Sequence, residues 1–351
     1  MKKHRSGIIN RFLGCIMAKT VKMQDIAEKL GVSTMTVSKA LSGKSGVSEQ
    51  TRQRIKDLAA EMGYVLPATE REGEKRSYNV GVILADYYSY SMATFYWKLY
   101  QEICTNAVQN NCFVILEMIS PSDEENENLP KMVSENKVDG VIVLGNMKKS
   151  YLERLEKTKV PVVFMDFYNM DICEDSVISN SFYGTYKITN YLFRKGHRDI
   201  AFVGNIHTTM SIMDRFLGYE KSLISHGIKL REDWIISDRE SERVSYEDIT
   251  LPKQMPTAFV CNCDQTASTL INCLKKAGYR VPEDISVVGY DDYLYPGLCD
   301  VGITTYGVNM TSMALKGIRL MIEKVEDPGH KKGTHIMDGY LVERDSVKEY
   351  R

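Results

Sequence analysis

The sequence has no long run of apolar residues. A membrane-spanning helix needs about 18 or more of them in succession, and no stretch of the 351 residues approaches that length. Residues 1–5 and 12–15 superficially resemble a lipoprotein signal, but Asn10 and Arg11 interrupt its short apolar core. We therefore expect a cytoplasmic protein that makes no membrane contact, with a disordered extension over residues 1–16.

Metal-binding and catalytic patterns are also scarce. The eight cysteines form no CxxC pair and the six histidines form no cluster, so we expect free thiols in a reducing compartment and no metal site. Neither GxGxxG after a strand, nor GxxxxGKS/T, nor GxSxG occurs. Gly43-Lys-Ser45 lacks the earlier glycine that a phosphate loop requires. These absences predict a protein with no enzymatic activity, no catalytic residues and no cofactor.

The net charge of −1 hides an uneven distribution. Residues 1–66 contain 12 lysines and arginines against 5 aspartates and glutamates, a net charge of +7. Residues 67–351 therefore carry −8. The basic N-terminal part suits the phosphate backbone of nucleic acid, which would repel the acidic remainder.

Three short helical patterns lie between residues 22 and 66. In the first, apolar residues recur at the spacing of one helical face, at Met23, Ile26, Ala27 and Leu30. Gly31 tolerates the left-handed backbone that ends a helix. Ser33 is then a natural N-cap for a second helix over residues 34–41.

The second helix turns Val37, Ala40 and Leu41 inward, and Ser48 caps a third helix. The third helix has an apolar side made of Ile55, Leu58, Ala59 and Met62. Three helices packed in this way leave the second free to enter a major groove, as in a helix-turn-helix. The alternative is a small helical bundle that packs on another surface, but a polar outer face is hard to explain as core.

Beyond residue 79, short apolar runs alternate with helical patterns. Runs that are apolar on both faces indicate buried parallel strands with crossover helices. They are too numerous for one comfortable sheet, so two doubly wound lobes are expected. The runs are 80–85, 112–116, 140–144, 161–165, 200–204, 257–261 and 285–289.

These segments resemble the LacI/GalR family of bacterial transcription regulators. The match in the N-terminal part covers residues 21–43, 47–52 and 62–64. It continues through the body at residues 139–143, 196–204, 215–219, 226–228, 256–259 and 281–292. The resemblance implies an all-α helix-turn-helix head joined to an α/β body of the type I periplasmic-binding-protein fold, with two doubly wound lobes.

The resemblance also implies the domain organisation. A helix-turn-helix DNA-binding domain is expected over residues 17–66, a hinge or linker over 67–78, and a two-lobed effector-binding and dimerisation domain over 79–351. The first lobe is expected to take 79–167 plus a helix near 308–326. The second is expected to take 168–304 plus a last strand near 335–344, so that the chain crosses between lobes three times.

Ligands of open parallel sheets bind beyond the carboxyl ends of the strands, which places a candidate effector site between the lobes. Alternatively, Asp166 or Asp291 caps a helix and does not contact a ligand. The candidates that follow predicted strands are Asp86, Tyr87, Tyr88, Asp166, Asp264 and Asp291.

The family resemblance adds further effector-binding candidates. Arg215 opens an Arg-x-x-Gly-Tyr motif whose arginine contacts the effector in the family, and a guanidinium opposite carboxylates suits vicinal hydroxyls. Phe95, Tyr96 and Trp97 fall where the family stacks aromatic rings on a sugar or base, with core packing as the alternative. Cys263 stands where the family commonly has Asn, which removes a donor and an acceptor from the cleft.

In the second helix, Thr34, Met35 and Lys39 face outward and are expected to read bases, whereas nearby hydroxyl groups suit phosphates. The family usually has Arg at the position of Lys39, and lysine lacks the planar fork that holds guanine. The expected DNA-binding residues are Met23, Ser33, Thr34, Met35, Thr36, Ser38, Lys39, Ser48 and Thr51.

The hinge departs most from the family, in which an Ala-Arg-x-Leu segment folds on DNA and its Leu wedges into the minor groove. Only Arg71 matches here, because Glu70 takes the Ala position and Gly73 the Leu position. A charged segment that contains glycine predicts a flexible solvated linker.

The sequence thus predicts a dimeric, sequence-specific DNA-binding regulator, a repressor of a carbohydrate-utilisation operon. Its expected partners are a double-stranded operator, a small-molecule effector (a carbohydrate) and a second copy of the chain. The principal alternative is a solute-binding receptor without DNA function, which residues 21–64 argue against. A sugar-metabolising enzyme on the same scaffold would lack a catalytic constellation.

Overall fold

The computed structural model describes residues 21–41, 46–62, 64, 76–88, 95–172, 174–239, 249–294, 297–327 and 329–350. The chain divides into two compact units, residues 1–76 and 77–351, called here the head and the body. The expected extension over residues 1–16, and residues 67–75 of the expected hinge, lie outside the described residues. Within the described ranges, no helix is both long and apolar enough to cross a membrane.

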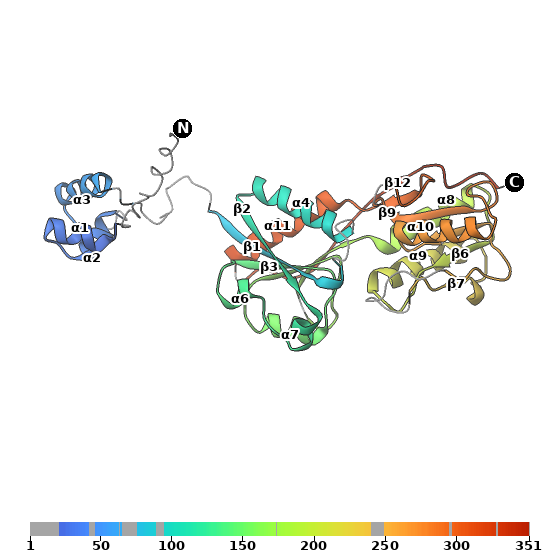
Figure 1. The fold of residues 1–351 in the computed structure, drawn as a ribbon, viewed down its shortest axis with the longest axis horizontal. Helices are drawn as coiled ribbons and strands as arrows, with labels where there is room; N and C mark the ends of the chain where they lie inside the picture. Colours follow the sequence, from blue (N-terminus) through green and yellow to red (C-terminus); the bar gives the residue numbers. More distant parts are fainter. Residues whose placement is uncertain are drawn as a thin grey trace, which may run out of the picture. The chain divides into compact units, whose positions relative to one another are not determined.

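Three short helices form the head: α1 (Met23–Leu30), α2 (Thr34–Leu41) and α3 (Glu49–Glu61) (Figure 1). Gly31 has a φ of 65°, a left-handed conformation that its missing Cβ permits, so α1 ends there and the chain turns into α2. The predicted helix-turn-helix is confirmed, with a small core made of Ile26, Ala27, Val37, Ala40, Leu41, Ile55 and Ala59.

The first lobe of the body is a six-stranded sheet in the order β11-β5-β4-β3-β1-β2, with every pair parallel. Its strands are β1 (Tyr78–Ala85), β2 (Cys112–Ile119), β3 (Gly140–Leu144), β4 (Val162–Met165), β5 (Asp175–Ser179) and β11 (Thr334–Met337). Neighbouring residues of a strand face opposite sides of a sheet. Val82 therefore packs on the side of α4 and α11, and Ile83 on the side of α6 and α7. The helices are η1 (Asp86–Tyr88), α4 (Phe95–Gln109), α5 (Pro121–Glu125), α6 (Lys131–Ser134), α7 (Lys149–Glu156) and α11 (Met310–Glu326).

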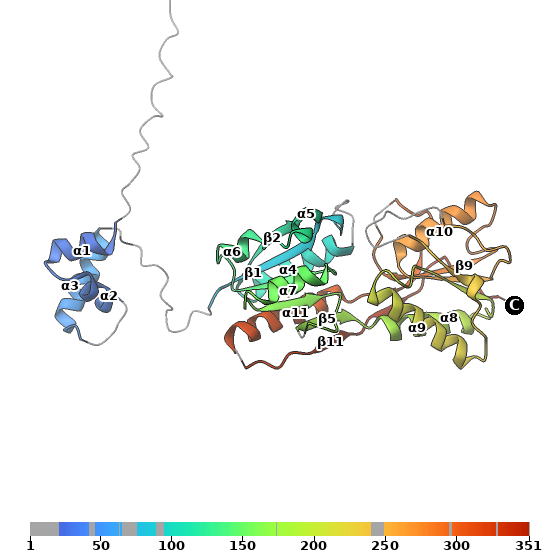
Figure 2. The same ribbon diagram turned by 90° about the horizontal axis from the view of Figure 1, so that it is seen from below.

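The second lobe has a sheet in the order β12-β10-β9-β8-β6-β7, parallel except for β12. Its strands are β6 (Ile200–Val203), β7 (Ile235–Ile236), β8 (Ala258–Cys261), β9 (Ser286–Asp291), β10 (Thr304–Gly307) and β12 (Tyr340–Val342). One face is covered by α8 and α9 and the other by α10 (Figure 2). The helices are α8 (Ser181–Arg194), α9 (Met210–Ser225), η2 (Glu232–Trp234) and α10 (Asp264–Lys276).

The chain crosses between the lobes three times, after β5, after β10 and between β11 and β12, but the expected lobe boundary at 167/168 is wrong. β5 pairs with β4 and β11 in the first lobe, so the first lobe continues to Ser179. β5 is not an apolar run, because it begins with Asp175. This carboxylate is fully buried, 3.2 Å from Lys324 Nζ.

The last strand expected near 335–344 is in fact two strands that belong to different lobes, β11 and β12. The chain passes from one sheet to the other at Gly339. There a Cβ would clash with the carbonyl oxygen of Gly307 in β10. The close approach to β10 therefore requires glycine at this position.

Candidate nucleic-acid interface and ligand site

The outward face of α2 consists of polar side chains and one methionine. Thr34, Met35, Ser38 and Lys39 are exposed, and Met35 has 67% of its surface open to solvent. Thr36 is half-buried. The opposite face of α2 is buried in the core of the head, so the exposed face is the one that can contact DNA.

Two serines of the predicted DNA-binding set cap helices. Ser33 Oγ accepts a hydrogen bond from the backbone N–H of Thr36 (3.1 Å) and shares one with Thr36 Oγ1 (2.8 Å). Ser48 repeats this pattern with Thr51 at the start of α3, at 3.3 and 2.7 Å. These hydroxyls satisfy N–H groups that a helix start leaves open. A phosphate bound by either serine would therefore meet a side chain whose position is already fixed.

Arg52, to which the sequence analysis gives no role, fixes the other end of α2. Its Nη1 donates to the carbonyl oxygens of Lys39 (3.2 Å) and Ala40 (3.0 Å), and its Nε lies 3.3 Å from Glu49 Oε2. A cation at a helix C-terminus is electrostatically favourable. Met23, in contrast, is half-buried against the core of the head and presents only part of its side chain to solvent.

In the body, Arg215 of α9 is the centre of a buried polar cluster. Only 6% of its surface is exposed. Its Nη1 donates to the carbonyl oxygen of Asn262 (2.6 Å), and its Nη2 lies 3.3 Å from Asp291 Oδ1. The guanidinium carbon lies 3.9 Å from the centre of the Tyr290 ring. Within the described residues its Nε has no hydrogen-bond partner, so the guanidinium group retains one N–H donor.

Two aspartates from different lobes, Asp291 and Asp166, supply the acidic groups of this cluster. Burial raises the pKa of Asp291 to about 7 and that of Asp166 to about 6, although Arg215 opposes both shifts. Asp166 follows β4, and its Oδ2 accepts a hydrogen bond from the Tyr96 hydroxyl (3.0 Å). Near neutral pH these carboxyl groups titrate, so each can donate or accept a hydrogen bond.

Aromatic rings of the first lobe adjoin Asp166 through Tyr96. The Tyr96 ring centre lies 4.4 Å from that of Tyr88 and 5.5 Å from that of Phe95. Tyr87 also contacts Tyr88, at 4.4 Å, and its hydroxyl donates to the Asn146 carbonyl oxygen (2.8 Å). These rings are half-buried, so each has part of its surface open to solvent.

Trp97 packs elsewhere, against Tyr100, with ring centres 5.3 Å apart. Gly145, at the end of β3, leaves room for the aromatic group. It has a φ of 79°, and a Cβ there would come within 2.6 Å of the Tyr88 ring.

The remaining predicted effector residues differ in their placement. Cys263 Sγ accepts from the Thr266 N–H (3.4 Å) and caps α10. Asp264 is buried in the second lobe, where its Oδ2 accepts from the backbone N–H of Tyr293 (2.9 Å). Its Oδ1 packs so closely on Gly289 that a Cβ there would clash. Asp264 thus supports the loop after β9, whereas Asp86 is half-buried in η1.

Asp238 is a residue that the sequence analysis misses. It is fully buried and accepts hydrogen bonds from the Asn205 N–H (2.9 Å), Asn262 Nδ2 (2.9 Å), Thr266 Oγ1 (2.6 Å) and Arg239 Nη2 (2.8 Å). Burial alone would raise its pKa, but these partners lower it. Asp238 therefore joins the ends of β6, β7 and β8 and orients Asn262, whose carbonyl oxygen holds Arg215. The strand that precedes Asp238, β7, has only two residues, too few to give a recognisable sequence pattern.

A helix-turn-helix head and a two-lobed body with a buried arginine and aspartate cluster define a DNA-binding regulator that responds to a small ligand. The family model described as bacterial regulatory proteins, lacI family, matches residues 22–66, and a periplasmic binding protein-like domain matches residues 189–347. The chain belongs to the lacI family of bacterial transcription regulators.

Two curated relatives match nearly the whole chain. The transcriptional repressor PurR of Vibrio campbellii is 26% identical, over 93% of this chain and 98% of its own length. The transcriptional regulator RegA of Clostridium saccharobutylicum is 28% identical, over 94% and 100%. Both alignments span the head and the body.

Solved structures share the fold. The transcriptional regulator CelR in complex with cellobiose superposes with a TM-score of 0.66 at 21% identity, covering 93% of this chain and 99% of that one. The lac repressor dimer bound to operator and the anti-inducer ONPF gives 0.67 at 23% identity, covering 94% and 100%.

Proposed function

We propose that this regulator is a cytoplasmic repressor whose affinity for its operator is set by a carbohydrate bound around Arg215. The observation that carries the proposal is the pairing of Arg215 Nη2 with Asp291 Oδ1 at 3.3 Å, with Asp166 of the other lobe near enough to alter the pKa of Asp291. A ligand that contacts these three side chains contacts both lobes.

The chemistry of the cluster favours a polyhydroxylated ligand. The buried Nε of Arg215, which has no hydrogen-bond partner among the described residues, would offer a donor. The two carboxyl groups with a raised pKa would exchange donor and acceptor roles with sugar hydroxyls. The rings of Tyr88, Phe95 and Tyr96 offer apolar faces for the C–H face of a sugar. Asp86, Tyr87 and Cys263 would lie at the margin of such a site. The cellobiose complex of a protein with the same fold supports this class of ligand.

The head would contact DNA through α2. Thr34, Met35 and Lys39 would meet base edges, with the exposed Met35 suited to a thymine methyl group. The hydroxyl groups at the starts of α2 and α3, together with that of Ser38, would contact phosphates. Those at the helix starts belong to Ser33, Thr36, Ser48 and Thr51. Two copies of the chain, related by a two-fold axis, would read a pseudo-palindrome with half-sites one helical turn apart.

Ligand control would follow from a difference in affinity. A carbohydrate that binds one arrangement of the lobes more tightly than the other increases the population of that arrangement. The resulting change in operator affinity is no larger than the ratio of the carbohydrate's affinities for the two arrangements.

The test is a mobility-shift titration of the full chain on the DNA upstream of its own gene, with and without a panel that includes cellobiose and ribose. The proposal predicts a specific complex whose midpoint moves with one sugar in wild type and does not move in Arg215→Ala. Arg231→Ala is the control, because Arg231 is on the same lobe and pairs with Asp233 at the surface. A sugar that binds while no DNA complex forms would favour the solute-receptor alternative. A sugar recovered chemically altered would favour an enzyme.

A further inference from the structure

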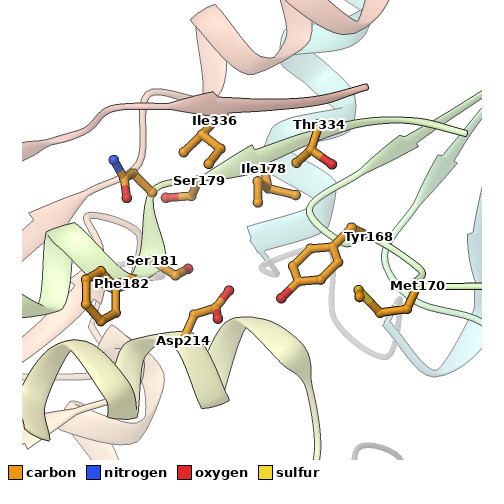
Figure 3. Close-up of a pocket in the computed structure, with 10 residues that line it drawn as sticks. Tyr168, Met170, Ile178, Ser179, Ser181, Phe182, Asp214, Thr334 and Ile336 are labelled. Atoms are coloured by element: carbon orange, nitrogen blue, oxygen red, sulfur yellow. The ribbon is translucent and has the colours of Figure 1, made fainter. Parts of the chain in front are cut away.

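A cavity lies beside the crossover from β5 to α8, with a volume of about 370 Å³ (Figure 3). Its size falls within the range of small-molecule sites in proteins, roughly 300–1,000 Å³. Both lobes contribute to it. The first lobe supplies Tyr168, Met170, Ile178 and Ile336, and the second supplies Phe182 and Asp214.

The cavity is separate from the Arg215 cluster. Between them, the Ser179 hydroxyl is hydrogen-bonded to the Tyr290 hydroxyl (2.8 Å), and the Tyr290 ring packs on the Arg215 guanidinium. Ser179 lines the cavity, whereas neither Arg215 nor Asp291 does so. A molecule in the cavity therefore does not cover Arg215 or Asp291. The cavity nevertheless adjoins the cluster, because a narrow hollow that shares Tyr168, Ser179 and Asp214 with the cavity also contains Asp166.

Most polar groups of the lining already have partners. Ser179 is bonded to Tyr290, and the Asn180 amide donates to Asp338 Oδ1 (2.7 Å) and accepts from the Tyr183 N–H (3.3 Å). These groups offer little to a polyhydroxylated ligand.

Asp214 is the charged group of the cavity. Its carboxylate points into the space and is hydrogen-bonded to the Tyr168 hydroxyl. Burial raises its pKa, against the opposing effects of Arg215 and Tyr168. Among the described residues, no lysine, arginine or histidine lines the cavity. A half-buried carboxylate with a phenol as its neighbour retains acceptor capacity and favours a positively charged partner.

The rest of the lining is apolar and largely uncovered. Met170 has 84% and Ile336 57% of their surfaces exposed, which is high for large apolar side chains that share one hollow. Ile178 and the Phe182 ring extend the same wall. An apolar group seated there would remove this surface from water.

From these observations we propose that the cavity is a second ligand site, for an organic cation that joins an ammonium group to an aromatic or alkyl group. The ammonium donates to Asp214, and the apolar group covers Ile178, Ile336 and Met170. Because both lobes form the walls, the ligand contacts both. This site adjoins the proposed carbohydrate site on the side of Asp166, and binding of the cation does not require a carbohydrate.

The test is calorimetric titration of the full chain with 2-phenylethylammonium chloride, and with 2-phenylethanol as the neutral analogue of the same shape. The ammonium compound is expected to bind saturably, at least tenfold more tightly than the alcohol. Asp214→Asn keeps an oxygen acceptor for Tyr168 and is expected to remove that tenfold preference. Glu220→Gln, on the same helix, is expected to leave it unchanged. Ile336→Ser, on an exposed edge strand, is expected to weaken both compounds.

Two results would overturn the proposal. One is the absence of saturable binding of the ammonium compound to wild type at millimolar concentrations. The other is a preference that survives in Asp214→Asn but is lost in Asp291→Asn, which would place the ammonium compound at the Arg215 cluster instead. Neither readout involves DNA or a sugar, so a failure here is distinguishable from a failure of the proposed function.

Discussion

Arg215 Nη2 lies 3.3 Å from Asp291 Oδ1 in the interior of the body. Both residues belong to the second lobe, so the pair is formed without any contribution from a ligand. Asp166 of the first lobe raises the pKa of Asp291 in addition to burial. The pKa of Asp291 therefore depends on residues of both lobes.

Arg215→Ala and Asp291→Ala are expected to abolish the response to ligand while leaving operator binding by the free protein near normal. The exposed face of α2 belongs to the head, whereas both residues belong to the body. Asp291→Ala leaves the buried Arg215 charge without its partner at 3.3 Å, and breaking such a pair typically costs about 3–5 kcal/mol. Arg215→Ala is expected to cost less, because the Asp291 carboxyl group, with a pKa of about 7, can take up a proton. Thermal unfolding should show this loss, and calorimetry with the ligand should show no binding. Undiminished ligand affinity in both variants would remove these residues from the site.

The stability that Asp291 and Asp166 contribute to the body is expected to fall as pH rises from about 4 to about 7. The folded state raises the pKa of Asp291 to about 7 and that of Asp166 to about 6, above an unfolded value of about 3.9. A raised carboxyl pKa means that the folded state binds more protons, so the stability it contributes is lost as pH rises through the folded value. Denaturant titrations of wild type and Asp291→Asn between pH 4 and 8 would measure this. The variant should lose a large part of the slope, and an identical slope would show that Asp291 does not cause it.

Lys39→Ala is expected to weaken binding to the specific operator more than binding to random DNA, by about 1–3 kcal/mol, the usual value of a good base contact. Lys29→Ala removes an exposed charge from α1 instead of α2 and is the matched control. Fluorescence anisotropy at one fixed salt concentration would compare the two sequences. Equal losses on both would show that Lys39 contacts phosphate alone.

The operator is expected to bend little. A leucine wedge bends DNA because unstacking a base step, at a few kcal/mol, is offset by added contacts, and this chain has Gly73 at the wedge position. A glycine costs a helix about 1 kcal/mol relative to alanine. A circular-permutation gel should show only a small mobility difference, and changes at the operator centre should matter little. A sharp central kink would mean that another residue, such as Leu66, acts as the wedge.

The sequence predicted those parts of the fold that rest on periodic burial. The inward faces of α1, α2 and α3 and the apolar strands of both sheets follow this rule. β5 was missed because its buried Asp175 is stabilised by Lys324, about 150 residues away in the chain, and no local pattern reports such a pairing.

The residues of the candidate ligand site were also predicted only in part. Asp166 and Asp291 stand at the carboxyl ends of β4 and β9, where ligands of parallel sheets bind. Arg215 of α9 and Tyr96 of α4 contact them from helices. The position after a strand does not fix the direction of a side chain. Asp264 also follows a strand, but it is directed into the second lobe by the Tyr293 N–H and the space at Gly289.

The central claim is that one ligand, bound around Arg215, controls operator binding. The most direct measurement is calorimetric titration of that ligand into the full-length protein with and without saturating operator. Linkage requires that the factor by which operator changes ligand affinity equals the factor by which ligand changes operator affinity. The account predicts that the two factors agree in wild type, and that both become 1 in Arg215→Ala. A ligand that binds with the same affinity with and without operator would contradict it.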